Sequence, residues 1–220
     1  SDRHKAVHYQ AIADGILAHV ADAGLGRDAV VLDYACGEAL ETPRVAAAVG
    51  RLVLCDGAPS VVAKLRERFG GLGNVGFALP EDLDAELGDG TADLIVVSSL
   101  IQYLSRRDFA ALLDRFRAKL KHGGRLVVAD VLPPDAGMVA DVASLLRNAL
   151  KHGYLPAALM GLVATAVSPY RKLRSEIGLA TYAEADLLAL MAEHGFSAVR
   201  HRPNLGLTPH RMTFVGRPAV

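Results

Sequence analysis

Short apolar runs alternate with helical patterns through the first 131 residues, and this alternation constrains the fold more than any other feature. Five runs rich in β-branched residues predict strands at 29–33, 52–56, 75–78, 93–97 and 125–131. Each run is nearly continuously apolar, as in parallel strands that are buried on both faces. Helical patterns at 45–50, 60–70 and 105–121 lie between them. The alternation predicts an α/β fold with a doubly wound, mostly parallel sheet and right-handed crossovers.

Local signals predict where two of the helices begin and end. A capping-box pattern from Ser105 to Asp108 predicts the start of the helix at 105–121, and Gly123-Gly124 is expected to end it. A second capping box, from Thr181 to Glu184, predicts the start of a later helix.

The C-terminal part of the chain predicts a different strand arrangement. Residues 196–202 and 210–217 form two alternating segments joined by a loop that is rich in proline and glycine, which indicates an antiparallel hairpin. The expected fold is therefore a Rossmann-like sheet of seven strands with a terminal hairpin. We expect one domain over 1–220. Its parts are an N-terminal cap helix (1–25), a cofactor-binding core (28–131), a helical lid insertion (135–194) and the hairpin (196–217).

Composition excludes several classes of protein. The chain has 220 residues, 51% of them hydrophobic, so it can fill a core and is not of a disordered type. Lys and Arg number 24, as do Asp and Glu, and this balance argues against a nucleic-acid-binding protein. Only two cysteines are present, and the first ten residues are polar and carry no signal peptide pattern. These features predict a cytoplasmic protein.

The most informative segment is VVLDYACGEAL, residues 30–40. An apolar strand runs into Asp33, and a loop of small residues then leads toward a helix, which is where open α/β sheets bind ligands. Asp56 ends the second strand, 19 residues after Gly37, where a carboxylate can accept hydrogen bonds from both hydroxyls of a ribose. The loop lacks the G-x-G-x-x-G pattern of dinucleotide sites, and no P-loop is present. The segment therefore predicts a nucleoside ligand, and Asp33 favours a cationic one.

These residues resemble those of the class I S-adenosylmethionine (SAM)-dependent methyltransferases of the small-molecule type (methyltransferase type 11/12-like). The family's first motif, approximately V-L-D-x-G-C-G-x-G, matches residues 31–39, with Ala35 and Ala39 in place of the outer glycines. Asp56, the segment 93–100 and Gly123-Gly124 match later motifs in the same order. Leu79 stands where the family usually has an aspartate near the adenine.

The resemblance implies SAM as cofactor and S-adenosylhomocysteine (SAH) as its product. It places Asp33 at the amino-acid end of the cofactor, Gly37 and Ala35 in the loop beside it, and Asp56 at the ribose. It also places Gly57 and Ala58 at the adenine edge, and Ser98 and Ser99 beneath the sulfonium. Tyr9 is expected to fold over the cofactor.

The acceptor side is expected after the fourth strand and in the lid. Gln102 takes the position where some family members have a histidine, and Gln102 and Tyr103 are the candidate catalytic residues. Within 145–175, a long uncharged segment with basic flanks predicts a lid over an apolar pocket. Its alternatives are an interfacial helix on anionic lipid, a pocket in which Arg171 or Arg174 holds the acidic group of an amphipathic substrate, a surface buried against a second copy of the chain, and an ordinary buried helix. Four candidate substrate-binding residues lie there: Tyr154, Tyr170, Arg171 and Arg174.

The predicted activity is methyl transfer to a small apolar or amphipathic acceptor by in-line attack on the sulfonium methyl. The alternatives are a binding or regulatory protein that has lost turnover and a NAD-dependent dehydrogenase. No metal is expected, because His4 and His8 provide only two ligands with helical spacing. We expect no nucleic-acid partner; a transient contact with a membrane surface and a homodimer are retained as alternatives.

Overall fold

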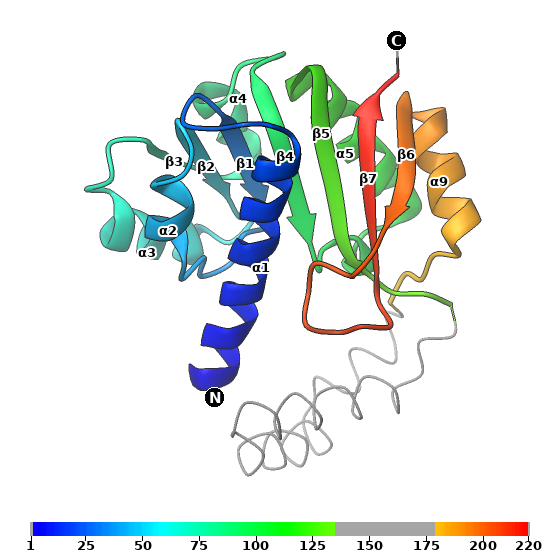
Figure 1. Ribbon diagram of the computed structural model, residues 1–220, viewed down its shortest axis with the longest axis horizontal. Coiled ribbons are helices and arrows are strands. Elements are labelled where there is room, and N and C mark those ends of the chain that lie inside the picture. The colour runs from blue at the N-terminus through cyan, green and yellow to red at the C-terminus, as the bar shows by residue number, and fades with distance from the viewer. Residues whose placement is uncertain (1, 135–178, 220) are drawn as a thin grey trace.

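The computed structural model of the protein describes residues 2–134 and 179–219 and contains a seven-stranded sheet. The strands follow the order β3-β2-β1-β4-β5-β7-β6 (Figure 1). Neighbouring strands from β3 to β5 are parallel, and β7 is antiparallel to both β5 and β6. The strand bounds are β1 Val30–Tyr34, β2 Arg51–Cys55, β3 Val75–Ala78, β4 Ala92–Ser98, β5 Leu120–Val131, β6 Phe196–His201 and β7 Met212–Pro218. The predicted Rossmann-like sheet with its terminal antiparallel hairpin is confirmed.

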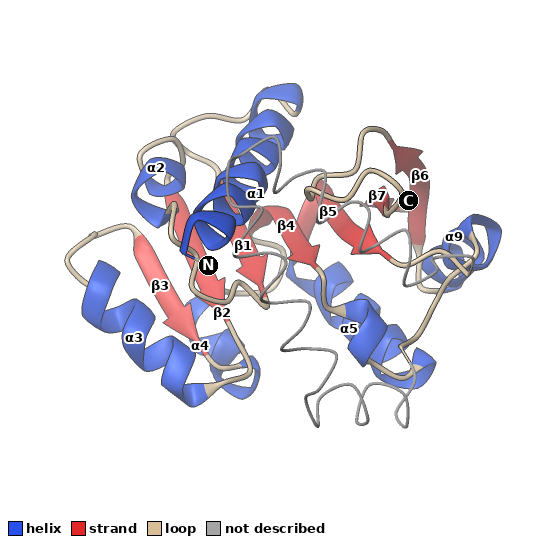
Figure 2. Ribbon diagram, turned by 90° about the horizontal axis from the view of Figure 1, so that it is seen from below, coloured by secondary structure: helices blue, strands red, loops and turns tan. Residues whose placement is uncertain are grey.

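Helices cover both faces of this sheet (Figure 2). Buried residues of α1, α2 and α3 belong to the hydrophobic cluster on one face. Buried residues of α5 and α9 belong to the cluster on the other. The bounds of the helical segments are α1 Asp2–Asp22, α2 Thr42–Ala46, α3 Pro59–Phe69, η1 Pro80–Asp82, α4 Leu83–Glu86, η2 Ile101–Tyr103, α5 Arg106–Lys119 and α9 Glu184–Glu193.

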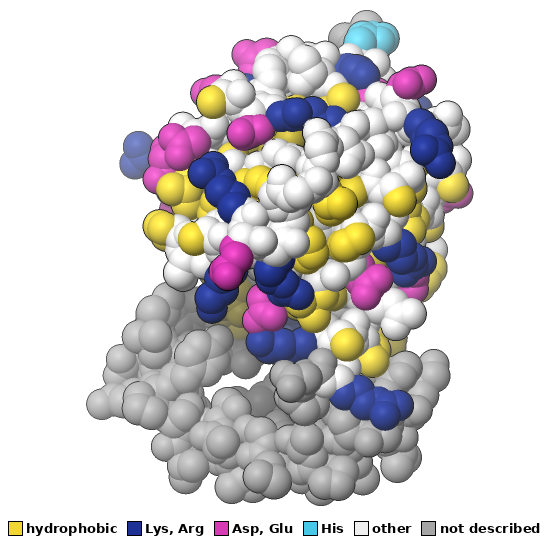
Figure 3. Space-filling model, turned by 90° about the vertical axis from the view of Figure 1, so that its left-hand side faces the viewer, with side chains coloured by type: hydrophobic (Ala, Val, Ile, Leu, Met, Phe, Trp, Pro, Cys, Tyr) yellow, Lys and Arg dark blue, Asp and Glu magenta, His cyan; other side chains and the backbone are white. Residues whose placement is uncertain are grey.

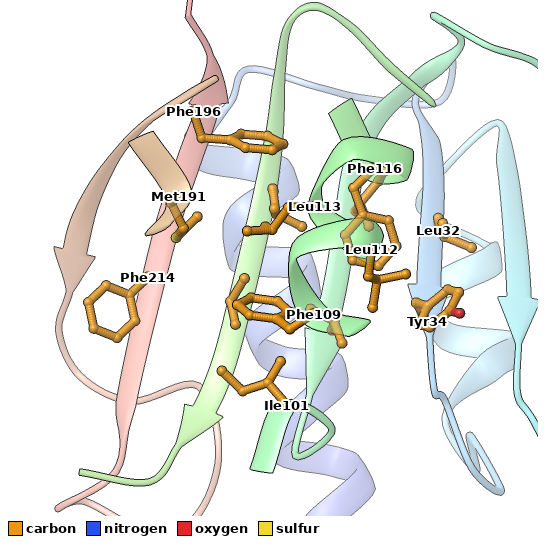
Figure 4. Packing of buried hydrophobic residues seen from close by; sticks show 14 of the residues in the cluster. Leu32, Tyr34, Ile101, Phe109, Leu112, Leu113, Phe116, Met191, Phe196 and Phe214 are labelled. Carbon is orange, nitrogen blue, oxygen red and sulfur yellow. The ribbon is translucent and has the colours of Figure 1, made fainter. Parts of the chain in front are cut away.

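The larger core cluster lies between the sheet and α5 (Figure 4). Phe109 and Phe116 of α5 are fully buried, and Phe116 makes an edge-to-face contact with Tyr34 of β1 at a centroid separation of 5.1 Å. Met191 of α9 and Phe214 of β7 extend the same cluster toward the hairpin. Burial of large apolar side chains is the main term that favours folding, so this cluster holds the sheet and its helices as one unit.

Strand order reverses at β1, which lies between β2 and β4. Ligands of open α/β sheets bind at such a switch point, outside the carboxyl ends of the strands. The N-terminal half of α1 extends past this edge of the sheet (Figure 1). The residues at the carboxyl ends of β1, β2, β4 and β5 are therefore the candidates for a ligand-binding site.

The predicted start of α5 is confirmed, but its predicted end is wrong. Ser105 is the N-cap, and its hydroxyl accepts a hydrogen bond from the backbone N–H of Asp108 at 3.1 Å. The helix ends at Lys119, and Gly123-Gly124 lie within β5 instead of ending the helix. Leu120 already pairs with Ala92 of β4, and the register shifts one step later. The glycines therefore permit a bulge near the start of a long strand, since Gly123 has a φ of +83°.

The predicted capping box at Thr181 is also wrong, because α9 begins after Ala183 without a side-chain cap. Tertiary contacts hold the preceding chain extended. The backbone N–H of Tyr182 bonds to the carbonyl of Leu132 at 2.9 Å, and the Tyr182 ring packs 6.0 Å from that of Phe109. The predicted lid of 135–194 lies mostly outside the described residues, and α9, its last helix, packs against β6 in the core.

Candidate functional site

The loop after β1 has a backbone that glycine usually adopts. Ala35, Gly37 and Ala39 have φ angles of 60°, 59° and 39°, all in the left-handed region. Alanine reaches this region only at a cost of roughly 1–2 kcal/mol per residue. The methyl group of Ala39 is buried among the residues beneath α1 and α2, which offsets part of that cost. The loop thus keeps the shape that the family motif needs, although two of its three glycines are replaced.

Two carboxylates flank this loop. Asp56 follows β2, and its oxygens accept hydrogen bonds from the backbone N–H groups of Gly37 at 3.0 Å and Ala58 at 2.9 Å. Asp33 lies in β1 and is buried, facing the same side of the sheet as α1. Burial raises the pKa of Asp33 to about 7, and the nearby charge of Asp56 adds to that increase. A cation placed against Asp33 would stabilise its ionised form.

A small cavity lies between Asp33 and the N-terminal helix. Its volume is about 20 Å³, which is room for roughly one water molecule. Tyr9 and Ile12 of α1, Thr42 of α2 and Leu54 of β2 are among its lining residues. The cavity shows that the Asp33 carboxyl group is not packed directly against apolar side chains on every side.

Tyr9 connects α1 to the loop. Its hydroxyl oxygen accepts a hydrogen bond from the backbone N–H of Glu38 at 2.8 Å. A Cβ atom on Gly37 would lie 2.7 Å from the same oxygen, so this close approach requires glycine. Lys5, one turn earlier in α1, forms an ion pair with the Glu38 side chain. The helix that was expected to fold over a cofactor therefore contacts the loop at two points.

The segment after β4 contributes buried polar atoms. The Ser98 hydroxyl and the Gln102 carbonyl oxygen are buried and have no hydrogen-bond partner among the described residues. The amide nitrogen of Gln102 donates to the backbone carbonyl of Ser99 at 2.8 Å, and Ser99 has a φ of 56°. Unpaired buried polar atoms and strained backbone are enriched at functional sites. Tyr103, the neighbour of Gln102, keeps 60% of its surface exposed.

A polar cluster at the end of β5 was not anticipated from the sequence. The Asp130 carboxylate accepts hydrogen bonds from the Ser99 hydroxyl at 2.6 Å, from Arg211 at 2.8 Å and from Asn204 at 3.1 Å. Thr213 donates its hydroxyl to the Asn204 side-chain oxygen at 2.7 Å. Asp130 also has a φ of 61°. Its position in the strand could have indicated it. Asp130 is the last residue but one of β5, as Asp33 is of β1, and Asp56 directly follows β2.

The remaining predicted residues fall in three places. Gly57 is exposed beside Asp56, and Ala58 is the N-cap of α3. Leu79 packs against the cluster beneath α3 and precedes the η1 turn. The four predicted substrate-binding residues, Tyr154, Tyr170, Arg171 and Arg174, lie outside the described residues. Within 2–134 and 179–219, no group of three or more metal-ligating side chains forms a metal site, and no helix has the length and apolar character to cross a membrane.

Solved structures with this architecture are numerous, although their sequences are distant. Magnesium protoporphyrin IX methyltransferase from Synechocystis PCC 6803, solved with SAH, is 17% identical, with a TM-score of 0.63; the match covers 99% of this chain and 86% of that one. A 1,6-didemethyltoxoflavin-N1-methyltransferase from Burkholderia thailandensis, solved with its substrate and SAH, is 19% identical, with a TM-score of 0.61, covering 96% and 79%. DhpI in its SAH complex is 16% identical, with a TM-score of 0.54, covering 88% and 78%.

The sequence comparisons agree with the fold. Residues 31–124 match the profile of the family described as "Methyltransferase domain". No curated protein sequence matches the chain. The matched residues run from β1 into the first part of β5 and include both Asp33 and Asp56. The expected resemblance is confirmed: the chain carries a methyltransferase domain on the Rossmann-like fold of the class I SAM-dependent methyltransferases.

Proposed function

We propose that the protein transfers a methyl group from SAM to a small apolar or amphipathic acceptor. The observation that carries this proposal is the arrangement of Asp33, Asp56 and the loop between β1 and α2. The loop holds its left-handed backbone, and the two carboxylates stand on either side of it. Residues after β4 and β5 add polar groups along the same edge of the sheet.

The Asp56 carboxylate fits a ribose. A carboxylate has about four lone-pair sites, and the N–H groups of Gly37 and Ala58 occupy two of them. Two sites remain for the two hydroxyls of a ribose. The backbone donors also hold the carboxylate in one orientation, so little freedom would be lost when a nucleoside binds. Gly57 and Ala58 would then lie beside the adenine.

Asp33 fits the cationic end of the cofactor. Burial raises the pKa of Asp33 to about 7, so near neutral pH its carboxyl group is partly protonated. A neighbouring cation would lower this pKa and favour the carboxylate. The ammonium group of SAM supplies such a cation. Tyr9 borders the same region, and it would help to exclude water from it by closing α1 onto the loop.

When bound, SAM supplies a methyl group made electrophilic by its sulfonium. The protein's principal task is then to hold the acceptor close to this carbon and in line with the bond that breaks. Ser98, Ser99 and Gln102 lie at the carboxyl end of β4, where the resemblance places the sulfonium. The unpaired oxygens of Ser98 and Gln102 are candidate hydrogen-bond partners for the acceptor or the cofactor. The exposed ring of Tyr103 is a candidate acceptor contact.

The distribution of surface charge bears on the class of acceptor. On the face shown in Figure 3, positive and negative side chains are interspersed among apolar ones. A nucleic-acid partner usually requires a stripe of one sign, and this face does not show one. Several statements remain predictions from the sequence. They are a cytoplasmic location, contact with an anionic membrane surface, pairing with a second copy, and substrate specificity from Tyr154, Tyr170, Arg171 and Arg174.

The alternative is a binding protein that has kept the fold without turnover. Replacement of two motif glycines by alanine motivates it. The left-handed φ angles of Ala35 and Ala39 count against it, because the loop shape survives the replacement. Detection of methyl transfer would exclude the alternative.

Titration calorimetry tests the cofactor assignment. SAM and SAH should bind, NADH should not, and Asp56→Ala should weaken SAM binding at least tenfold. Asp28→Ala is the matched control, because Asp28 is an exposed carboxylate before β1. If neither nucleoside binds to the wild-type protein, or if Asp28→Ala and Asp56→Ala weaken binding equally, the proposal is wrong.

A further inference from the structure

One carboxylate ties the end of β5 both to the hairpin and to the turn after β4. The Asp130 side chain accepts hydrogen bonds from Asn204 at 3.1 Å and from Arg211 at 2.8 Å, and both of these residues lie in the segment that joins β6 to β7. The backbone N–H of Asp130 donates to the side-chain oxygen of Asn204 at 3.2 Å. From the turn after β4, the Ser99 hydroxyl donates to the same carboxylate at 2.6 Å. Partners on two segments therefore hold Asp130 in one position.

Ser99 in turn holds the side chain of Gln102. The amide nitrogen of Gln102 donates a hydrogen bond to the backbone carbonyl of Ser99 at 2.8 Å. The reverse orientation of the amide would bring two carbonyl oxygens together, so this contact decides which end of the amide faces Ser99. The carbonyl oxygen of Gln102 is left buried without a partner among the described residues, and only 4% of the residue is exposed. A buried oxygen of this kind is costly unless a hydrogen-bond donor binds to it.

This turn leaves the sheet beside the loop after β1. Tyr34 of β1 pairs with Val97 of β4 in parallel register. The next residues, Ala35 and Ser98, therefore start from neighbouring strand ends, and neighbouring strands lie about 4.8 Å apart. On its other side, Ser98 pairs with Ala129 of β5. The turn that begins at Ser98 thus lies between the proposed cofactor loop and the end of β5.

We propose that the carbonyl oxygen of Gln102 selects the methyl acceptor and that Asp130 is the positioning residue that holds Gln102 for this task. The acceptor is then a compound with a hydroxyl or amine group, whose proton binds to the Gln102 oxygen. The inference rests on the proposed function and adds the chemical class of its acceptor. Such a hydrogen bond engages the acceptor's proton and leaves a lone pair of its oxygen or nitrogen free to meet the methyl group.

The donor belongs to the acceptor because the cofactor has other partners. In the proposed complex, Asp33 meets the ammonium group of the cofactor and Asp56 meets its ribose hydroxyls. Asp130 acts from a distance, through Ser99. Ser99 has a φ of 56°, a backbone conformation that is costly for a residue other than glycine. Its hydrogen bond to Asp130 offsets part of that cost and fixes the direction of the carbonyl group that holds Gln102.

Hydrogen exchange of the Gln102 side chain, followed by NMR in the full chain, tests the positioning. The sequence has two glutamines, so the exposed Gln10 is an internal reference. The side-chain amide protons of Gln102 should exchange slowly in the wild-type protein and at least tenfold faster in Ser99→Ala and in Asp130→Asn. Backbone amides of β4 should stay protected in Ser99→Ala, which distinguishes a local effect from unfolding.

The matched control removes a hydroxyl at the opposite end of β4. Thr91 donates a hydrogen bond to the carbonyl of Gly88 at 2.7 Å, and Thr91→Val should leave the exchange of Gln102 unchanged. If Asp130→Asn folds poorly, Asp130→Asn/Arg211→Gln removes the charge together with its partner. Unchanged exchange of Gln102 in the folded Ser99 or Asp130 variant would overturn the role of Asp130.

Binding of phenol and toluene to the SAH complex, measured by NMR titration, tests the acceptor class. The two probes have nearly the same shape, and only phenol has a hydroxyl proton to donate. The wild-type protein should bind phenol about tenfold more tightly than toluene, the effect of one buried hydrogen bond. Gln102→Met, which keeps a long unbranched side chain without the carbonyl oxygen, should lose this preference. The exposed Gln10→Met is its matched control and should keep it.

Calorimetry with SAH separates the two hypotheses. Gln102→Met should bind SAH as the wild-type protein does, because its oxygen is assigned to the acceptor. Loss of the preference for phenol with normal SAH affinity supports the inference. No preference for phenol in the wild-type protein, or the same preference in Gln102→Met, would overturn the inference and leave the proposed function intact. Failure of the wild-type protein to bind SAH would overturn both.

Discussion

The hydroxyl of Tyr9 accepts a hydrogen bond from the backbone N–H of Glu38, and the 2.8 Å contact ties the N-terminal helix to the loop after β1. The same hydroxyl oxygen lies 2.7 Å from the position that a Cβ atom on Gly37 would take. Residues 28 positions apart in the sequence therefore determine together whether α1 closes the site.

Gly37→Ala should destabilise the protein and weaken SAM binding. The new methyl group would meet the Tyr9 oxygen at 2.7 Å, and the φ of +59° is unfavourable for alanine. We expect a loss of about 2 kcal/mol in the free energy of unfolding, measured with urea. Tyr9→Phe in the same chain should recover the steric part of this loss only. If Gly37→Ala unfolds at the wild-type urea concentration, the close approach does not exist in solution.

Ala35→Gly should stabilise the protein or leave it unchanged. Alanine has a strain of roughly 1–2 kcal/mol at a φ of 60°, and glycine does not, so the substitution removes this cost from the folded state. Glycine also increases the entropy of the unfolded chain, which lowers stability by about 0.4–1 kcal/mol. The expected net gain is about 0.5–1 kcal/mol. Ala63→Gly, at an exposed position inside α3, should instead lower stability by about 1 kcal/mol. Equal losses in both variants would contradict the left-handed loop.

Asp33 should make cofactor binding depend on pH. Its pKa is raised to about 7 in the folded protein from 3.8. The ionised form binds a cation, so SAM affinity should fall as the pH drops through about 7, and Asp33→Asn should remove this dependence. Calorimetry from pH 5.5 to 8.5 measures it, with exposed Asp28→Asn as the control.

The same group affects stability with a defined sign. Between about pH 4 and pH 7, the folded state binds more protons at Asp33 than the unfolded state does, so this contribution to stability declines as the pH rises through that window. Asp33→Asn should therefore unfold at higher urea than the wild-type protein at pH 8. A variant less stable than the wild-type protein at that pH would contradict the burial of a carboxylate there.

His19 should weaken the protein in acid. Burial and the adjacent His201 lower its pKa from 6.5 to about 4. The unfolded state binds the extra proton between those values, so the free energy of unfolding should decrease as the pH falls from 6.5 toward 4, by at most about 1.4 kcal/mol per pH unit. Urea unfolding at pH 7 and pH 5 should show a smaller difference for His19→Gln than for the wild-type protein. The exposed His122→Gln should keep the wild-type difference.

Asp130 and Arg211 should behave as a coupled pair. Removing one partner of a buried ion pair leaves an uncompensated charge and typically costs about 3–5 kcal/mol. Asp130→Asn should show a loss of about that size, since only 10% of the Asp130 side chain and 15% of the Arg211 side chain are exposed. The double variant Asp130→Asn/Arg211→Gln should be more stable than the sum of the single effects implies. Additive effects in a double-mutant cycle would show that the two charges do not interact in solution.

Local sequence pattern predicted most of the secondary structure for a simple reason. Buried parallel strands must be apolar throughout, and the helices that cover them must be apolar on one side, so both leave a periodic signal. Two of the predicted boundaries that proved wrong, at Gly123-Gly124 and Thr181, share one cause. Leu120 and Tyr182 are engaged in pairing and packing with distant residues, and tertiary contacts override local capping and helix-end signals.

The motif at β1 and the acid at Asp56 were visible in the sequence because chain order alone places strand ends at one edge of a parallel sheet. The position of Tyr9 over Gly37 and the cluster of Ser99, Asp130 and Arg211 were not. Those groups come from five separate segments of the chain. Their distances depend on how α1 and the C-terminal hairpin pack onto the sheet, and no spacing within one segment encodes that packing.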